Sequence, residues 1–130
     1  MRTSRTRQSQ SGVMLIEALV AILLFSVGVV AVMGMQAVSI EQVSQAKYRA
    51  DASYLANQIA GRMWVDQANL ATYTTPGTAG RTTWDATVAS TLPQGTGTIA
   101  IAGTMVTITV NWKTPQDTST HKFVSVININ

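Results

Sequence analysis

Residues 13–40 have the sequence VMLIEALVAILLFSVGVVAVMGMQAVSI, and this stretch decides how the rest of the chain can fold. From Ala18 to Ile40 it contains 23 residues without a charged side chain. As an α-helix that run is about 35 Å long, enough to cross a hydrocarbon core of about 30 Å. We therefore expect 13–40 to form a membrane-spanning helix.

The residues before this stretch differ sharply from it. Residues 1–12, MRTSRTRQSQSG, are polar and carry three arginines, which account for the whole net charge of +3. We interpret them as a leader peptide. Arginines before an apolar run favour a cytoplasmic N-terminus and translocation of everything after Ile40.

Without the leader, the chain has no basic excess. Residues 13–130 contain six Lys or Arg and six Asp or Glu. Contacts to phosphates supply most non-specific affinity for nucleic acids, so a DNA receptor should have a basic surface. We therefore expect no nucleic-acid partner.

A helical pattern continues beyond the apolar stretch. Residues 41–70 contain no proline, and their one glycine is Gly61. Apolar positions recur three or four residues apart, which predicts an amphipathic helix with one face against a folded domain; they are Tyr48, Ala52, Leu55, Ile59 and Met63. Arg49, Ser53 and Asn57 mark its polar face. A single helix from about Val13 to about Leu70 is expected.

The remaining residues predict a short helix and three strands. Residues 71–82 are rich in Thr and Gly and are expected to form a loop. A helix is expected over 84–91, with Thr83 as its N-cap. Its apolar face should consist of Trp84, Val88 and Leu92.

Residues 98–101 and 105–112 flank a tight turn and predict a β-hairpin, followed by a last strand over 122–129. In the second strand alternate residues are apolar, namely Val106, Ile108, Val110 and Trp112. The expected fold is therefore α+β: a long N-terminal helix packed on a small antiparallel β-sheet, with 41–130 as one αβ domain.

Glu17 is the most informative charged residue, because a carboxylate one turn into a membrane helix is costly. It is the fifth residue after Gly12. Cleavage after Gly12 would create a cationic amine on Val13 about one turn away, and the two charges could then neutralise each other. The alternative is that Glu17 reaches the water interface and does nothing specific.

Small side chains recur along the same helix at close to 3.5-residue spacing. In lipid, such a stripe lets helix backbones approach closely. The stripe consists of Ala18, Ala21, Gly28 and Ala31. The alternative is that Ala and Gly are simply common in membrane helices.

The segment from the basic leader through Gly12, Leu15, Ile16 and Glu17 resembles the class III signal and N-terminal helix of type IV pilins and pseudopilins. The resemblance implies a pilin-like fold, cleavage after Gly12 by a prepilin peptidase, N-methylation of Val13 and a role for Glu17 in filament assembly. Val13 stands where the family usually has phenylalanine, and Met14 where it usually has threonine or serine. Both are tolerated variants.

Later segments are similar to the PilV-like minor pilins, which take part in pilus assembly. The matching motifs are Arg62-Met63 and Leu92-Pro93-Gln94-Gly95. This resemblance implies a single-pass inner-membrane protein with a periplasmic 41–130 domain. It also implies that the protein enters a pilus at the cell surface, at the tip of the filament. It also implies as partners other pilins and minor pilins, the prepilin peptidase, the inner-membrane assembly platform and membrane lipid. A minor pseudopilin of a type II secretion system remains the alternative.

Catalytic chemistry is not indicated. The chain has one histidine, His121, and no cysteine, so we expect no metal and no cofactor. No HExxH pair, P-loop or G-x-S-x-G motif occurs, and we expect no enzyme.

A ligand-binding role, as an adhesin or DNA receptor, remains a further alternative to a structural one. Trp64, Trp84 and Trp112 could form a stacking platform for sugars or bases. Each tryptophan also lies in a patterned element, so core packing is the expectation for all three.

Overall fold

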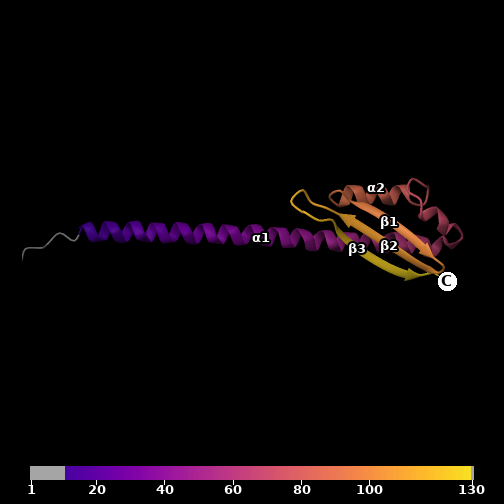
Figure 1. The fold of residues 1–130 in the computed structure, drawn as a ribbon, viewed down its shortest axis with the longest axis horizontal. Coiled ribbons are helices and arrows are strands. Elements are labelled where there is room, and N and C mark those ends of the chain that lie inside the picture. Colours follow the sequence, from indigo (N-terminus) through magenta and orange to yellow (C-terminus); the bar gives the residue numbers. More distant parts are fainter. Residues whose placement is uncertain (1–10, 130) are drawn as a thin grey trace, which may run out of the picture. The chain divides into compact units, whose positions relative to one another are not determined.

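The computed structural model describes residues 11–129, and the expected leader therefore lies outside the described residues except for its last two. The elements in chain order are helix α1 (Ser11–Val65), the 3-10 helix η1 (Gln67–Tyr73), helix α2 (Thr82–Thr91) and strands β1 (Thr96–Ala102), β2 (Met105–Trp112) and β3 (His121–Asn128) (Figure 1). This is the expected α+β arrangement. The chain divides into two compact units, one ending at Gln42 and one beginning at Val43.

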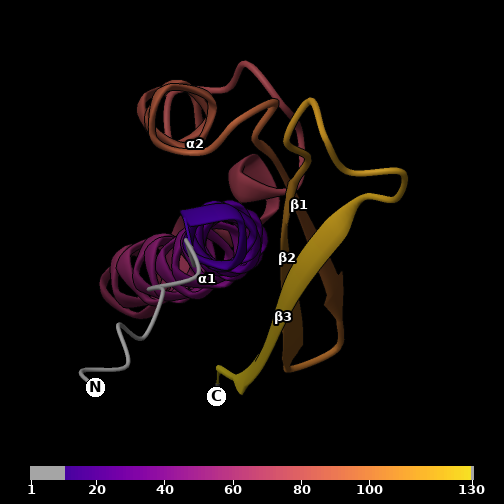
Figure 2. The ribbon, with the colours of Figure 1, turned by 90° about the vertical axis from the view of Figure 1, so that its left-hand side faces the viewer.

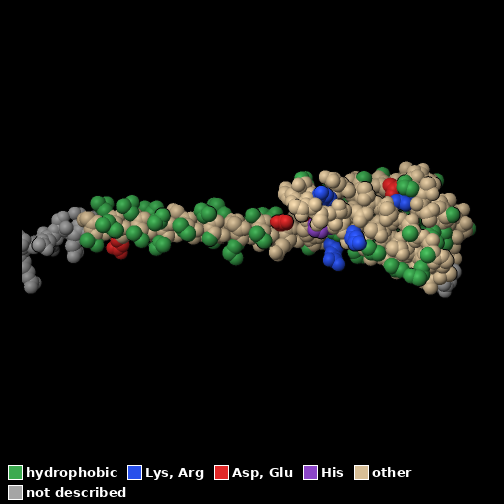
Figure 3. Space-filling view, in the orientation of Figure 1, with side chains coloured by type: hydrophobic (Ala, Val, Ile, Leu, Met, Phe, Trp, Pro, Cys, Tyr) green, Lys and Arg blue, Asp and Glu red, His purple; other side chains and the backbone are tan. Residues whose placement is uncertain are grey.

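The first unit consists of the N-terminal part of α1. Within the described residues, α1 is the one helix long and apolar enough to cross a membrane. Its large apolar side chains are exposed all round the helix, from Val13 at 68% to Ile40 at 68%. Figure 3 shows apolar side chains along this part of the chain. Such a helix needs lipid or other helices around it, because nothing in its own unit covers it.

The second unit contains a three-stranded antiparallel sheet with the order β1-β2-β3. Ile108 in the central strand is paired with Ile99 of β1 and Ser125 of β3. The hairpin turn between β1 and β2 uses Gly103 with a φ of 62°, a conformation that favours glycine. The predicted hairpin and its apolar alternation are confirmed, because Val106, Ile108, Val110 and Trp112 are all buried.

Helix α2 and the Val43–Val65 part of α1 lie on the same face of this sheet (Figure 2). One core joins the three elements, and it confirms the two predicted helix faces. From α1 it takes Ala52, Leu55, Ala56, Ile59, Ala60 and Met63, and from α2 and its end Trp84, Val88 and Leu92. Tyr48 packs against this core while partly buried.

The first helix ends at Val65, and the prediction that it reaches about Leu70 is wrong. Asp66 leaves the helical conformation, with φ −113° and ψ 48°. Its carboxylate accepts a hydrogen bond from the side-chain amide of Asn69 at 2.6 Å and another from the Tyr73 hydroxyl at 3.1 Å. Such local bonds compete with helix formation. The predicted loop at 71–82 is therefore too long: residues 71–73 belong to η1, whose last residue Tyr73 is buried, and Thr82 belongs to the next helix.

The second helix begins earlier than predicted. It starts at Thr82 with Arg81 at the N-cap position and without a side-chain cap, so Thr83 is not the N-cap. The turn before it closes through backbone bonds from Arg81 and Thr82 to the Thr78 carbonyl. The last strand begins at His121, one residue earlier than predicted.

The prediction that all three tryptophans pack in the core is only partly correct. Trp84 and Trp112 are buried, but Trp64 is 48% exposed. Trp64 follows the buried Met63 and lies about 100° round the helix from it, at the border of the packed face. A stacking platform needs exposed rings, so Trp64 is the one tryptophan whose burial allows that alternative.

Candidate functional site

The predicted processing and assembly residues lie at the start of α1. Val13 and Glu17 are four residues apart in the helix, so their side chains are about 40° apart round its axis. Both side chains are exposed to the surroundings of the helix. This spacing places the side chains of Val13 and Glu17 on the same face of α1, one turn apart.

The small residues lie mostly on that same side. Counted at about 100° per residue, Ala21, Gly28 and Ala31 all lie within about 40° of Glu17. Ala18 lies about 100° from Glu17, at the flank, so the four residues form a broad face rather than a narrow stripe. All four are exposed in the single chain.

Shallow hollows mark where the small residues uncover the backbone. One, of about 520 Å³, is lined by Gly28 together with Phe25 and Val32 among others. A second, of about 430 Å³, lies beside Ala31 and Gly34. No atom lies within 4 Å of a Cβ placed on Gly28 or Gly34. Each hollow is a place where a neighbouring helix could approach closely.

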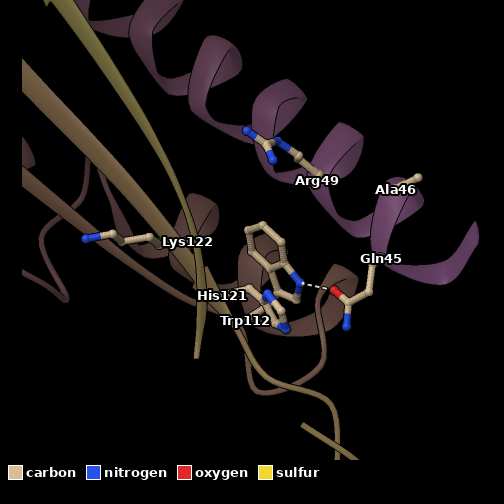
Figure 4. Close-up of a pocket in the computed structure, with 6 residues that line it drawn as sticks. All are labelled: Gln45, Ala46, Arg49, Trp112, His121 and Lys122. Carbon is tan, nitrogen blue, oxygen red and sulfur yellow. Dashed lines mark hydrogen bonds between the residues drawn. The ribbon is translucent and has the colours of Figure 1, made fainter. Parts of the chain in front are cut away.

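Sequence reasoning missed a polar cluster in the second unit, which we call the Gln45 junction: Gln45, Trp112, Thr114, Asp117 and His121. Figure 4 shows three of its members, Gln45, Trp112 and His121. Gln45 accepts a hydrogen bond from the Trp112 indole at 3.2 Å. Its amide donates to both carboxylate oxygens of Asp117 at 3.2 Å. One side chain of α1 therefore joins the end of β2 to the 113–120 loop.

Asp117 holds that loop in place. It accepts hydrogen bonds from the Thr114 hydroxyl at 2.7 Å and the Thr114 amide at 2.9 Å. These bonds lower the pKa of Asp117 from 3.8 to about 2, because they favour the charged carboxylate. The His121 ring stacks on Trp112 with 5.8 Å between centroids, and its Nε2 lies 3.3 Å from Asp117. The Thr114 to Asp117 spacing is a turn signal in the sequence, but nothing there indicates Gln45.

Arg81 is the second residue that sequence reasoning missed. Its side chain is 2% exposed and pairs with Asp85 at 2.9 Å. The guanidinium also donates to the carbonyls of Tyr73, Thr74 and Gly97. It lies 5.6 Å from the Trp84 ring centroid. One buried arginine therefore connects η1, α2 and β1, and the Arg81 to Asp85 spacing at a helix start is its one sequence signal.

The motif Leu92-Pro93-Gln94-Gly95 forms the tight turn between α2 and β1. Gln94 has a φ of 49°, and the Gly95 amide donates to the Leu92 carbonyl at 3.0 Å. A Cβ at position 95 would lie 2.4 Å from the Val88 carbonyl oxygen. Position 95 therefore requires glycine, because its backbone lies close to the Val88 carbonyl. The role of the motif is to form the turn between α2 and β1.

Among residues 11–129, no group of three or more His, Cys, Asp or Glu side chains could hold a metal ion. The chain matches no family model, no curated protein and no solved structure in the three comparisons made.

Proposed function

We propose that this chain is a minor pilin that takes part in assembly or priming of a type IV pilus, without catalytic activity of its own. In this proposal residues 13–40 anchor it in the inner membrane and later pack in the filament core. The 41–130 domain is periplasmic until the subunit enters the pilus. A prepilin peptidase cuts the chain after Gly12 and methylates Val13.

The observation that carries the proposal is the composition of one face of α1. That face holds Val13, Glu17 and the small residues Ala21, Gly28 and Ala31, and no other charged residue lies between Val13 and Ile40. A lone carboxylate on such a helix is costly in lipid unless a partner meets it. The small residues supply room for a neighbouring helix at the same face. Together they support a helix that packs against other subunits.

Glu17 would act by pairing with the N-terminal amine of Val13, most usefully that of a neighbouring subunit. An unpaired carboxylate and an unpaired ammonium are both penalised in lipid, so their pairing removes two penalties at once. Because the pair forms in one axial register only, Glu17 would set the register of the incoming subunit more than it would stabilise the chain.

The test is incorporation into sheared pili, with membrane levels of each variant as the control. Glu17→Ala should leave cleavage, insertion and the 43–130 fold intact but impair incorporation. Glu17→Asp should be partly tolerated, because its side chain is one methylene shorter. Equal incorporation of Glu17→Ala and wild type would contradict the pairing and support the alternative in which Glu17 only reaches the interface.

The same fractionation tests whether the subunit belongs to a pilus or to a type II secretion system. Recovery of the subunit in pili supports the pilus assignment, whereas its absence from pili and loss of type II secretion on gene deletion would support a minor pseudopilin.

The charge of the 43–130 unit gives little support to the alternative of a DNA receptor. The unit has six Lys or Arg and four Asp, and this basic excess is weak for a protein that binds DNA phosphates.

A further inference from the structure

The last strand of the sheet has one edge without a partner. β3 is an outer strand in the order β1-β2-β3 and pairs with β2 over its whole length, from His121 to Asn128. Figure 1 shows no described segment running along its other side. Among residues 11–129, no group of another element hydrogen-bonds to the backbone of β3 from that side.

The ladder between β2 and β3 shows which backbone groups of β3 are free. Antiparallel strands exchange hydrogen bonds at every second residue pair, and the residues in between point their N–H and C=O groups away from the partner strand. Ile129 donates to the Thr104 carbonyl at 2.8 Å, one pair beyond the end of β3. Odd-numbered residues of β3 therefore bond to β2, and even-numbered ones face the free edge. The latter are Lys122, Val124, Val126 and Asn128.

Nothing in the middle of β3 blocks a further strand. Residues 123–127, FVSVI, contain no charge, proline or glycine, and the register with β2 has no bulge. Natural edge strands usually carry such features, because an open edge is a template for pairing. Both faces of β3 are apolar: Val124 and Val126 are 46% and 54% exposed, and Phe123 and Ile127 pack against the core. Continuous apolar runs are typical of strands that are covered on both faces.

The opposite edge of the sheet is closed. The buried Arg81 guanidinium donates to the carbonyl of Gly97 in β1. Gly97 is opposite Val110 of β2, which by the same alternation bonds toward β3. The Gly97 carbonyl therefore points away from β2, and Arg81 occupies it. A second copy of this chain cannot pair its β1 along the full length of β3.

The β3 strand of a second copy is also excluded as the occupant. Two identical edges pair about a two-fold axis perpendicular to the sheet, which makes the two strands antiparallel. Such an axis also reverses the direction of α1, whose residues 43–65 pack on the sheet. Subunits anchored by α1 in one membrane point their helices the same way. This step rests on the membrane anchor of the proposed function.

We infer that the free edge of β3 receives an extended segment of a different protein as a fourth strand. The backbone groups of Val124 and Val126 would supply the hydrogen bonds at its centre. In such strand addition, main-chain bonds give affinity and alternate side chains give specificity. The added segment should be uncharged over about five residues and rich in β-branched side chains, because these pair favourably across strands.

The test uses the full chain in detergent micelles, with a fluorescein-labelled peptide of the β2 sequence MVTITVNW as the probe. This sequence already pairs with β3 within the folded chain. Fluorescence anisotropy, corrected for binding to empty micelles, should show saturable binding. A peptide with prolines at its two central positions should bind about tenfold more weakly, because proline cannot donate to the ladder.

Val126→Pro and Val126→Thr form a matched pair of variants. The N–H of Val126 faces the free edge, so proline removes it without breaking a bond to β2, whereas threonine keeps the N–H and the branched side chain. Proline should weaken binding by about tenfold and threonine by less than about threefold. Near-UV circular dichroism checks folding. If the proline variant does not fold, Val124→Lys replaces it, since a charge on the edge opposes pairing.

Hydrogen exchange locates the bound peptide. Binding should slow amide exchange in 121–129 and leave exchange in 96–102 unchanged. Absence of saturable binding, equal binding by wild type and the edge variant, or protection confined to 96–102 would each overturn the inference.

Light scattering of the chain without peptide tests the alternative occupant. A dimer that Val126→Pro dissociates would make a second copy the occupant and overturn the assignment to a different protein. A chain that stays soluble without detergent would contradict the membrane anchor and the proposed function. Peptide binding at β3 would be unaffected by that result, so the two failures are distinguishable.

Discussion

Gly97 on β1 lies directly against the indole of Trp84 on α2, so that a Cβ at position 97 would be 2.3 Å from two ring carbons. No real Cβ is found so close to another atom, and the ring is buried at 1% exposure with its Nε1 donating to the Leu55 carbonyl at 2.8 Å. The pair therefore fixes the distance between α2, the sheet and α1.

Gly97→Ala should destabilise the 43–130 unit by about 1–3 kcal/mol, the usual cost of inserting volume into a packed core. The measurement is the thermal midpoint of the full chain in detergent, followed by near-UV circular dichroism. Gly61→Ala is the control, since nothing lies within 4 Å of its added Cβ and alanine favours helix by about 0.5–1 kcal/mol. A midpoint for Gly97→Ala at or above that of wild type would contradict the contact.

Arg81→Met should be among the most damaging single changes in the second unit. It leaves the carbonyls of Tyr73, Thr74 and Gly97 and the carboxylate of Asp85 without their donor. Leaving one buried acceptor without its donor typically costs about 1–3 kcal/mol, and Arg81 is the donor to several.

The same thermal melt measures this effect. Arg81→Lys should recover only part of the loss, because lysine keeps the charge but cannot reach several acceptors with one planar group. Full recovery by lysine would mean that charge alone matters at this position.

Leu55→Ala should lower the free energy of unfolding of the second unit by about 2–5 kcal/mol, because it opens a cavity in the core. Leu55 is 1% exposed, whereas its neighbour Tyr54 is 67% exposed. Tyr54→Ala is therefore a matched control, expected within about 0.5 kcal/mol of wild type. If the two variants melted alike, the buried face of α1 would be assigned wrongly.

Asp117 should make the stability of the second unit depend on acid. Its folded pKa of about 2 lies below the ordinary 3.8, so the unfolded chain takes up a proton first as pH falls. The stabilisation is therefore complete above the unfolded pKa and is lost as pH falls through the window down to about 2.

Thermal midpoints of wild type and Asp117→Asn across that window provide the measurement. The gap between them should be widest near neutral pH and should narrow toward pH 2. A gap that stayed constant with pH would show that the carboxylate's charge does not contribute.

Processing should occur between Gly12 and Val13. Mass spectrometry of membrane or pilus fractions should find a mature chain that begins at an N-methylated Val13. A mature chain beginning at Met1, or cut at a site beyond the apolar stretch, would rule out a class III signal.

The sequence alone determined those features that depend on neighbours along the chain. The continuous apolar stretch to Ile40 predicts a helix, and the alternation from Val106 to Trp112 predicts a half-buried strand, because both periods follow directly from backbone geometry. The unusual position of Glu17 is likewise visible in the sequence, since hydropathy needs no tertiary contact.

Only the tertiary structure decided which distant residues meet. Gln45 and Asp117 are 72 positions apart, and Arg81 meets Gly97 across 16. Neither pair has a local pattern, because a polar side chain in a loop or on a helix face looks solvated until another element covers it. The end of α1 at Val65 and the exposure of Trp64 depend in the same way on packing, which selects among local conformations that differ by little free energy.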